Sequence, residues 1–178
     1  MIDVRIAPAA AAGDTGLVHQ LARLVNRVYA VAEEGLWADG APRTTPAEMA
    51  ELIAAGQIAL ARAEGRIVGA ARIRRLDTGE GEVAMLVADP AHRGTGVGRA
   101  LIRFAERWGH QQGLDTMQLE VLAPRRWAHP SKEFLKAWYT RLGYRPVRTG
   151  QFEESYPELA PHLATPCDFV IYHKALRP

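Results

Sequence analysis

Seven segments of the chain are apolar, or alternate between apolar and polar positions, which is the pattern of β-strands. In the first of them Ile2, Val4 and Ile6 alternate with charged residues. The second and third flank a Glu-Gly pair at residues 64–65, which predicts a hairpin. The predicted strands are residues 2–6, 57–63, 66–76, 82–87, 116–122, 144–148 and 168–175.

Four other segments repeat apolar residues at the spacing of three and four that is typical of helices. Asp14, Thr45 and Ser131 stand at the N-terminal ends of three of them and are good N-cap residues, so the ranges below include these caps. The predicted helices are residues 14–32, 45–55, 97–112 and 131–142. The order is therefore one strand, two helices, three strands, a helix, a strand, a helix and two strands, which predicts an α/β layer fold with a mixed sheet. A chain of 178 residues is expected to form a single domain over residues 1–178.

A glycine-rich turn joins the strand at 82–87 to the helix that begins at residue 97. Gly94, Gly96 and Gly98 remove Cβ atoms where the chain enters this helix, so several backbone N–H groups can face one anion. The spacing fits neither the G-x-x-x-x-G-K-[ST] phosphate loop nor the G-x-G-x-x-G dinucleotide fingerprint. The turn predicts a phosphate site of another kind, and the alternative is a tight turn that binds nothing.

Two motifs resemble those of a known family. Arg93, Gly96 and Gly98 form R-x-x-G-x-G after a strand that ends in Leu-Val-Ala-Asp-Pro, which resembles the acyl-CoA signature of the GNAT N-acetyltransferase superfamily. Residues 137–144, Ala-Trp-Tyr-Thr-Arg-Leu-Gly-Tyr, are similar to a later helix segment of that family. The resemblance extends from about residue 66 to the end of the chain.

The resemblance implies a largely antiparallel sheet with helices on both faces and acetyl-CoA as co-substrate, without a metal. The strands at 82–87 and 116–122 would be parallel and splay apart, and main-chain groups of the first would pair with the pantetheine arm. The pyrophosphate would lie on the glycine-rich turn. The implied cofactor residues are Leu86, Val87, Arg93, Gly94, Thr95, Gly96, Val97, Gly98, Arg99 and Lys132, the last where relatives often have asparagine.

Acetyl transfer to an amine needs a base for the amine proton and is helped by an acid for the departing thiolate. By position in the family motif, Tyr139 is the candidate acid. Glu82, at the start of its strand, is the candidate base, and simple alternation would put Leu86 on its face of the strand. The other candidate bases are His129, Glu33 and Glu34.

Three irregular segments, residues 33–43, 125–129 and 151–166, are expected to select the acceptor. Carboxylates in them suit a cationic amine, and two tryptophans could wall it. The residues concerned are Glu33, Glu34, Trp37, Trp127, Glu153 and Glu154. Arg125 and Arg126 support the opposite interpretation, an acidic acceptor.

Composition restricts the function further. Twenty-two basic and 20 acidic residues leave a formal charge of +2, which gives no reason to expect nucleic acid or a membrane as partner. Cys167, the single cysteine, excludes an internal disulfide and a cysteine-cage metal site, and no signal peptide or membrane span is recognisable. A cytoplasmic protein, monomeric or homodimeric, is expected.

These observations predict an N-acetyltransferase that moves an acetyl group from acetyl-CoA to a primary amine of a small molecule or a protein, by direct attack in a ternary complex. The alternative from another class is a non-catalytic module that binds acyl-CoA. A nucleotide-binding protein is the third possibility, and it predicts that ATP or NAD outcompetes CoA.

Overall fold

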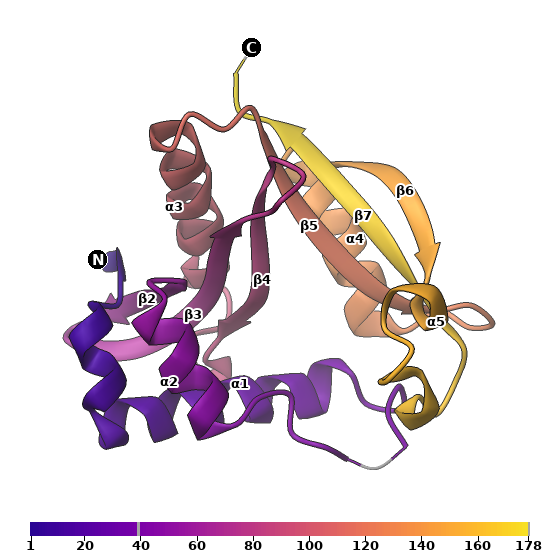
Figure 1. The fold of residues 1–178 in the computed structure, drawn as a ribbon, viewed down its shortest axis with the longest axis horizontal. Helices are drawn as coiled ribbons and strands as arrows, with labels where there is room; N and C mark the ends of the chain where they lie inside the picture. The colour runs from indigo at the N-terminus through magenta and orange to yellow at the C-terminus, as the bar shows by residue number, and fades with distance from the viewer. Residues whose placement is uncertain (39, 178) are drawn as a thin grey trace.

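The computed structural model describes residues 1–38 and 40–177, which form a seven-stranded sheet with helices on both faces (Figure 1). The strand order is β1-β2-β3-β4-β5-β7-β6, and only β4 and β5 pair in parallel within the described residues. The strands are β1 (Ile2–Ile6), β2 (Ile58–Ala63), β3 (Arg66–Arg75), β4 (Gly81–Ala88), β5 (Thr116–Pro124), β6 (Arg145–Gln151) and β7 (Cys167–Ala175). The α-helices are α1 (Thr15–Ala32), α2 (Pro46–Ala54), α3 (Val97–Gln111), α4 (Pro130–Arg141) and α5 (Phe152–Ser155). The mixed, largely antiparallel sheet is confirmed, and so is the predicted order except for the short helix α5 between β6 and β7, which was not predicted.

Two of the three predicted helix caps are present. The side chain of Asp14 accepts a hydrogen bond from the Leu17 N–H, and that of Thr45 accepts one from the Glu48 N–H. The third prediction, Ser131 as cap of α4, is wrong. The N-cap is His129, two residues earlier, and the helix begins at Pro130, because proline is well suited to the first helical position, where no N–H partner is needed.

Each face of the sheet has its own core. The larger core packs α3 and α4 against residues such as Val83 and Leu119, and the second packs α1 and α2 against residues such as Met85 and Val87. A smaller third core lies where the end of β5 meets the start of β7. It contains Leu36, Leu122, Phe152 and Cys167.

A β-bulge in β4 changes which residues face the α1 side. Met85 has a positive φ of 50°, and together with Leu86 it lies opposite the single residue Ala71 of β3. Because the extra residue reverses the alternation, Leu86 packs with the α3 core, whereas Glu82 faces the α1 side of the sheet. The prediction that these two residues share a face is therefore wrong.

The two parallel strands diverge soon after they meet. β4 and β5 pair only through residues 81–83 and 117–119. Beyond this point β4 continues along β3 while β5 continues along β7, and the two strands separate toward α1 (Figure 1). Unpaired backbone groups of β4 consequently border the space between the strands.

Candidate active site

The glycine-rich turn presents free backbone N–H groups at the start of α3. Gly94 and Gly96 have φ angles of 79° and 90°, and a Cβ built on either meets nothing within 4 Å. The first hydrogen bond of the helix runs from the Ala100 N–H to the Gly96 C=O at 2.9 Å, so the preceding helical N–H groups have no partner within the helix. Gly96 is the N-cap and has no side chain to cap them. The turn can therefore accept an anion at the positive end of the helix dipole.

The third glycine has a different role. A Cβ on Gly98 would approach the Trp138 ring of α4 to 3.1 Å. Its missing side chain thus allows α4 to pack close to the first turn of α3.

The other predicted residues of the turn separate into two kinds. Thr95 donates its hydroxyl to the His92 C=O at 2.7 Å, which makes it part of the turn's own geometry. Arg93 and Arg99 are exposed, and over the described part of the chain neither forms an ion pair. These two cations are available to an anion on the turn.

Strand alternation decides which groups of β4 face the space between the strands. The Asp89 N–H donates to the Val68 C=O of β3 at 2.8 Å. Along a strand, the N–H and C=O groups of successive residues point to alternate neighbouring strands. The main-chain groups of Val87, two residues before Asp89, therefore also point toward β3, and the main-chain groups of Leu86 and Ala88 point toward β5. The predicted pair of Leu86 and Val87 is accordingly revised to Leu86 and Ala88.

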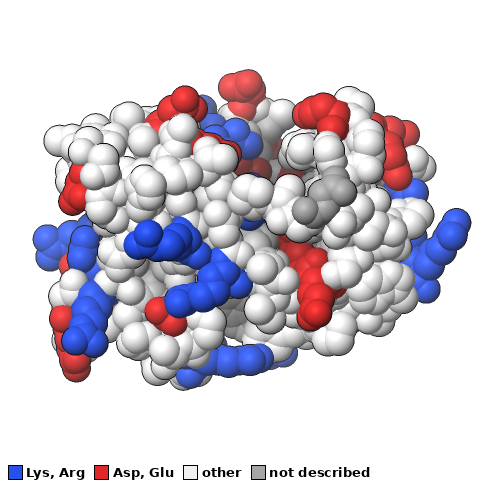
Figure 2. Space-filling view, turned by 90° about the horizontal axis from the view of Figure 1, so that it is seen from below, with Lys and Arg blue, Asp and Glu red and all other residues white. Residues whose placement is uncertain are grey.

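A polar row crosses the sheet on its α1 side, at the point where β4 and β5 meet. Arg74, Glu82, Gln118 and His173 are successive cross-strand partners on β3, β4, β5 and β7. Arg74 Nε lies 2.5 Å from Glu82 Oε2, and a His173 ring nitrogen lies 2.9 Å from Gln118 Oε1. Glu82 is buried, at 6% exposure, rather than solvated at a strand end. Viewed from the α1 side, the molecule is hollowed near the middle, with acidic and basic side chains around the hollow (Figure 2).

Sequence reasoning missed a second carboxylate at this point. Glu120 follows the last residue of β5 that pairs with β4, on the same face as Gln118. Burial raises the pKa of Glu120, the charge of Glu82 raises it further, and Arg74 and Arg148 lower it in part. The sequence does contain a signal, because Glu120 is the one charged residue of the strand Thr116–Pro124.

Tyr139 projects from α4 into the core on the other side of the sheet. It is 5% exposed, and its ring centroid lies 6.2 Å from those of Tyr144 and Tyr172. Burial raises the pKa of Tyr139, and interaction with Tyr29 of α1 adds to this shift.

Lys132 forms a buried ion pair with a carboxylate of the protein, whereas the sequence predicted a phosphate of CoA as its partner. Its Nζ lies 2.8 Å from Glu33 Oε1, with side-chain exposures of 5% and 9%, and Trp37 Nε1 donates to Glu33 Oε2 at 2.7 Å. A buried charge needs such a partner. Lys132, Glu33 and Trp37 therefore tie the start of α4 to the end of α1, and the predictions of Lys132 as a cofactor ligand and of Glu33 as an acceptor ligand or base are not supported.

Arg125 is likewise engaged within the protein. It pairs with Glu153, at 2.7 Å, and with Asp168, and both carboxylates raise its pKa. Arg125 thus holds the β6–β7 connection against the end of β5, and it does not offer a free charge to an acidic acceptor.

The remaining predicted residues lie around the same connections. Trp127 is 42% exposed and donates from Nε1 to Thr165 Oγ1 at 3.3 Å. Glu34 is exposed, and its C=O lies 2.9 Å from a ring nitrogen of His129, which is buried. His129 is the N-cap of α4, and among the described residues no contact joins it to the polar row.

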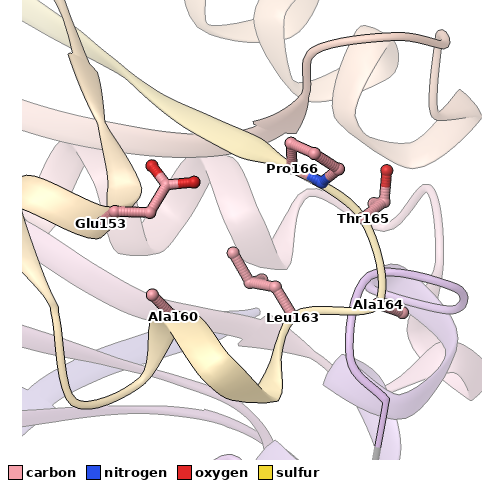
Figure 3. Close-up of a pocket in the computed structure, with 6 residues that line it drawn as sticks. All are labelled: Glu153, Ala160, Leu163, Ala164, Thr165 and Pro166. Atoms are coloured by element: carbon pink, nitrogen blue, oxygen red, sulfur yellow. The ribbon is translucent and has the colours of Figure 1, made fainter.

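A pocket of about 190 Å³ lies in the β6–β7 connection; Figure 3 shows the side chains that line it. Its lining residues are Glu153, Ala160, Leu163, Ala164, Thr165 and Pro166. None of the candidate catalytic residues lines it, and its one carboxylate is already paired with Arg125. We therefore place the chemistry at the polar row between the strands.

Within residues 1–38 and 40–177, no three histidine, cysteine, aspartate or glutamate side chains gather in a group able to hold a metal ion. In the same residues, no helix has both the length and the apolar character needed to cross a membrane. Cys167 is free and buried, and burial raises the pKa of its thiol to about 11, so it is a packing residue.

Comparison with known proteins agrees with this geometry. The family model described as the acetyltransferase (GNAT) family matches residues 23–144. No curated protein sequence matches the chain significantly.

Solved structures share the fold at low sequence identity. The PaiA N-acetyltransferase of Thermoplasma acidophilum, in complex with coenzyme A, has a TM-score of 0.68 at 15% identity, over 98% of this chain and 99% of that one. N-acetylglutamate synthase of Neisseria gonorrhoeae, with coenzyme A and N-acetyl-glutamate, has a TM-score of 0.67 at 14% identity, over 100% of this chain but only 36% of that one. An acetyltransferase of Bacillus anthracis in complex with acetyl coenzyme A has a TM-score of 0.54 at 14% identity, over 66% and 61% of the two chains.

Proposed function

The chain belongs to the acetyltransferase (GNAT) family of acetyl-CoA-dependent N-acetyltransferases, and from this premise we propose that it transfers an acetyl group to a primary amine by direct attack in a ternary complex. The observation that carries the proposal is the combination of an uncapped glycine turn with two carboxylates where β4 and β5 separate. A non-catalytic acyl-CoA module is not favoured, because it has no need for paired carboxylates at that point.

The described residues fit acetyl-CoA. The open space at Gly94 and Gly96, the free N–H groups that follow and the cations Arg93 and Arg99 suit its pyrophosphate. Leu86 and Ala88 have main-chain groups suited to its pantetheine arm. When bound, acetyl-CoA supplies an acyl group activated as a thioester.

Glu120 accepts the proton of the acceptor amine. Its raised pKa makes it a better proton acceptor near neutral pH than an ordinary carboxylate. Glu82, the candidate base predicted from the sequence, is paired with Arg74, and its charge helps to raise the pKa of Glu120. As the amine nitrogen bonds to the carbonyl carbon, the carbon–sulfur bond breaks and the amine proton goes to Glu120.

Tyr139 donates a hydrogen bond to the departing sulfur. Burial raises its pKa, so the phenol keeps its proton over the whole physiological range. The same shift makes complete proton transfer to a thiolate, with a pKa of about 8.5, unfavourable. Tyr139 therefore stabilises the leaving group mainly as a donor.

We expect Glu120→Gln to lower kcat/KM by about 100-fold, with little change in the affinity for CoA. Activity of the parent protein should rise with pH through a pKa above the usual value of about 4.3, and this limb should be absent from the variant. Steady-state rates against pH, together with calorimetric CoA titration, measure both effects. An unchanged pH profile in Glu120→Gln would exclude Glu120 as the base.

The same variant should not lose stability. The folded-state pKa of Glu120 lies above its unfolded value, so its contribution to stability is present at low pH and is lost as pH rises through the folded pKa. At pH 8 the neutral glutamine avoids this cost, and thermal unfolding should show an equal or higher Tm. A strongly lowered Tm would indicate a structural role instead.

Tyr139→Phe should reduce kcat by about tenfold or more while CoA affinity stays unchanged. Tyr172→Phe is the matched control, because Tyr172 is a buried neighbour of Tyr139 at 4% exposure. Single-turnover rates with acetyl-CoA measure the chemical step. Equal rates for both variants and the parent would remove Tyr139 from the mechanism.

The proposed function itself is tested by release of free thiol from acetyl-CoA in the presence of a panel of primary amines. Amine-dependent release together with a product heavier by one acetyl group supports it. Tight binding of CoA without turnover on any amine would favour the non-catalytic module.

We further propose that residues 1–178 act as one acetyltransferase domain in the cytoplasm, as a monomer or homodimer.

A further inference from the structure

The two connections that border the acceptor side are joined to each other. Two backbone hydrogen bonds of 2.8 Å link residues 36–38 to residues 162–164, around the paired residues Trp37 and Leu163. We call this pairing the loop bridge. Figure 3 shows the second of these segments passing beside the α1–α2 connection.

The loop bridge is anchored on the sheet next to the candidate base. Beneath it, Leu36 and Phe152 pack on Leu122, and all three side chains are at most 6% exposed. Leu122 lies on β5 two residues beyond Glu120, on the same face. An extended polypeptide laid along this face would meet the loop bridge.

The acceptor side also contains a cation without a counter-ion. Arg72 is half-buried, and its Nε donates to the neutral Oε1 of Gln57 at 2.8 Å. No carboxylate of the described residues forms an ion pair with it. Burial, followed by repulsion from Arg74, lowers the pKa of Arg72, and the more distant charges of Glu82 and Glu48 offset this only in part. Arg43, which lies over the Tyr29 ring at 5.2 Å, adds a second positive charge nearby. A partly buried, unpaired guanidinium is stabilised by an anion.

The position of this cation relates it to the reaction. Arg72 is two residues from Arg74 on one face of β3, which corresponds to about 7 Å, and Arg74 is bonded to Glu82. A guanidinium binds a carboxylate through two parallel hydrogen bonds. A small acceptor held in this way by Arg72 has its amine beside Glu82 and Glu120.

We infer that the acceptor is a small amine that also carries a carboxylate, that Arg72 binds this carboxylate with support from Arg43, and that the loop bridge excludes extended polypeptides. This inference rests on the proposed function and narrows it to one substrate class.

The test compares matched acceptors. Free α-amino acids and ω-amino acids are each assayed beside their own carboxamides, and beside peptides of ten residues with a free N-terminus. The carboxylate forms should have kcat/KM values about tenfold or more above those of the amides, a difference of about 1.4 kcal/mol, and the peptides should not be acetylated. Arg72→Gln should raise KM for the carboxylate acceptor by a similar factor, with kcat nearly unchanged. Arg75→Gln, an exposed arginine on the same strand, is the control and should change neither value.

The outcomes separate the inference from the proposed function. Turnover that is equal for acids and amides, or that is found with the peptides, overturns the inference and leaves the acetyltransferase activity standing. The inference is also overturned, and the acetyltransferase activity still stands, if Arg72→Gln lowers both kcat and KM by similar factors for every acceptor. Absence of turnover on every amine, despite CoA binding, refutes the proposed function itself.

Discussion

Gly96→Glu is expected to weaken CoA binding by about 100-fold or more, equivalent to about 2.7 kcal/mol. Gly96 is the N-cap of α3, in open space, and the N–H groups beyond it have no partner in the helix. A glutamate there adds a negative charge where the pyrophosphate is proposed to bind, and its own carboxylate can cap the free N–H groups. Calorimetric titration with CoA measures the loss.

The control must separate charge at the site from backbone strain. Gly65→Glu introduces the same residue at a similar φ of 77°, in the turn between β2 and β3, where a Cβ also meets nothing within 4 Å. Both variants should lose similar stability, because a side chain at positive φ is strained at either position. Only Gly96→Glu should lose CoA. Equal affinity of both variants for CoA would contradict the assignment of the turn.

Lys132→Met should destabilise the protein by about 3–5 kcal/mol, because it leaves the carboxylate of Glu33 buried without its cation. For a protein of this size that loss corresponds to a decrease in Tm on the order of 10 °C. Lys136→Met is the matched control one turn further along α4, since the Lys136–Glu133 pair is 29% and 51% exposed and should contribute less than about 1 kcal/mol. Thermal and urea unfolding measure both variants.

Two further measurements distinguish a structural Lys132 from a cofactor ligand. The double variant Lys132→Met/Glu33→Gln should recover part of the lost stability, because the unpaired charge is then removed. Affinity for CoA, measured where the variants are folded, should be close to that of the parent protein. A large loss of affinity without a loss of stability would restore the original prediction that Lys132 binds phosphate.

The candidate site was predicted unevenly. Gly94 and Gly96 were recognised because a turn with positive φ angles requires glycine, which is a local property of the chain. Glu120 was overlooked, since its importance depends on β5 leaving β4 just before that residue. The pairing of Lys132 with Glu33 was not predicted, because Glu33 lies 99 residues away in the sequence.

The sequence alone determined the order of strands and helices, two of the three helix caps and the turn that can bind phosphate. Each of these depends on residues within a few positions of one another, so periodicity and residue type are enough to predict them. The tertiary structure decided which charges are paired, where the two parallel strands separate and that the loop bridge joins the two connections. The bulge at Met85 illustrates the reason. One extra residue in β4 moves the Leu86 side chain to the opposite face of the sheet, and this extra residue can be recognised only from the pairing of β4 with β3.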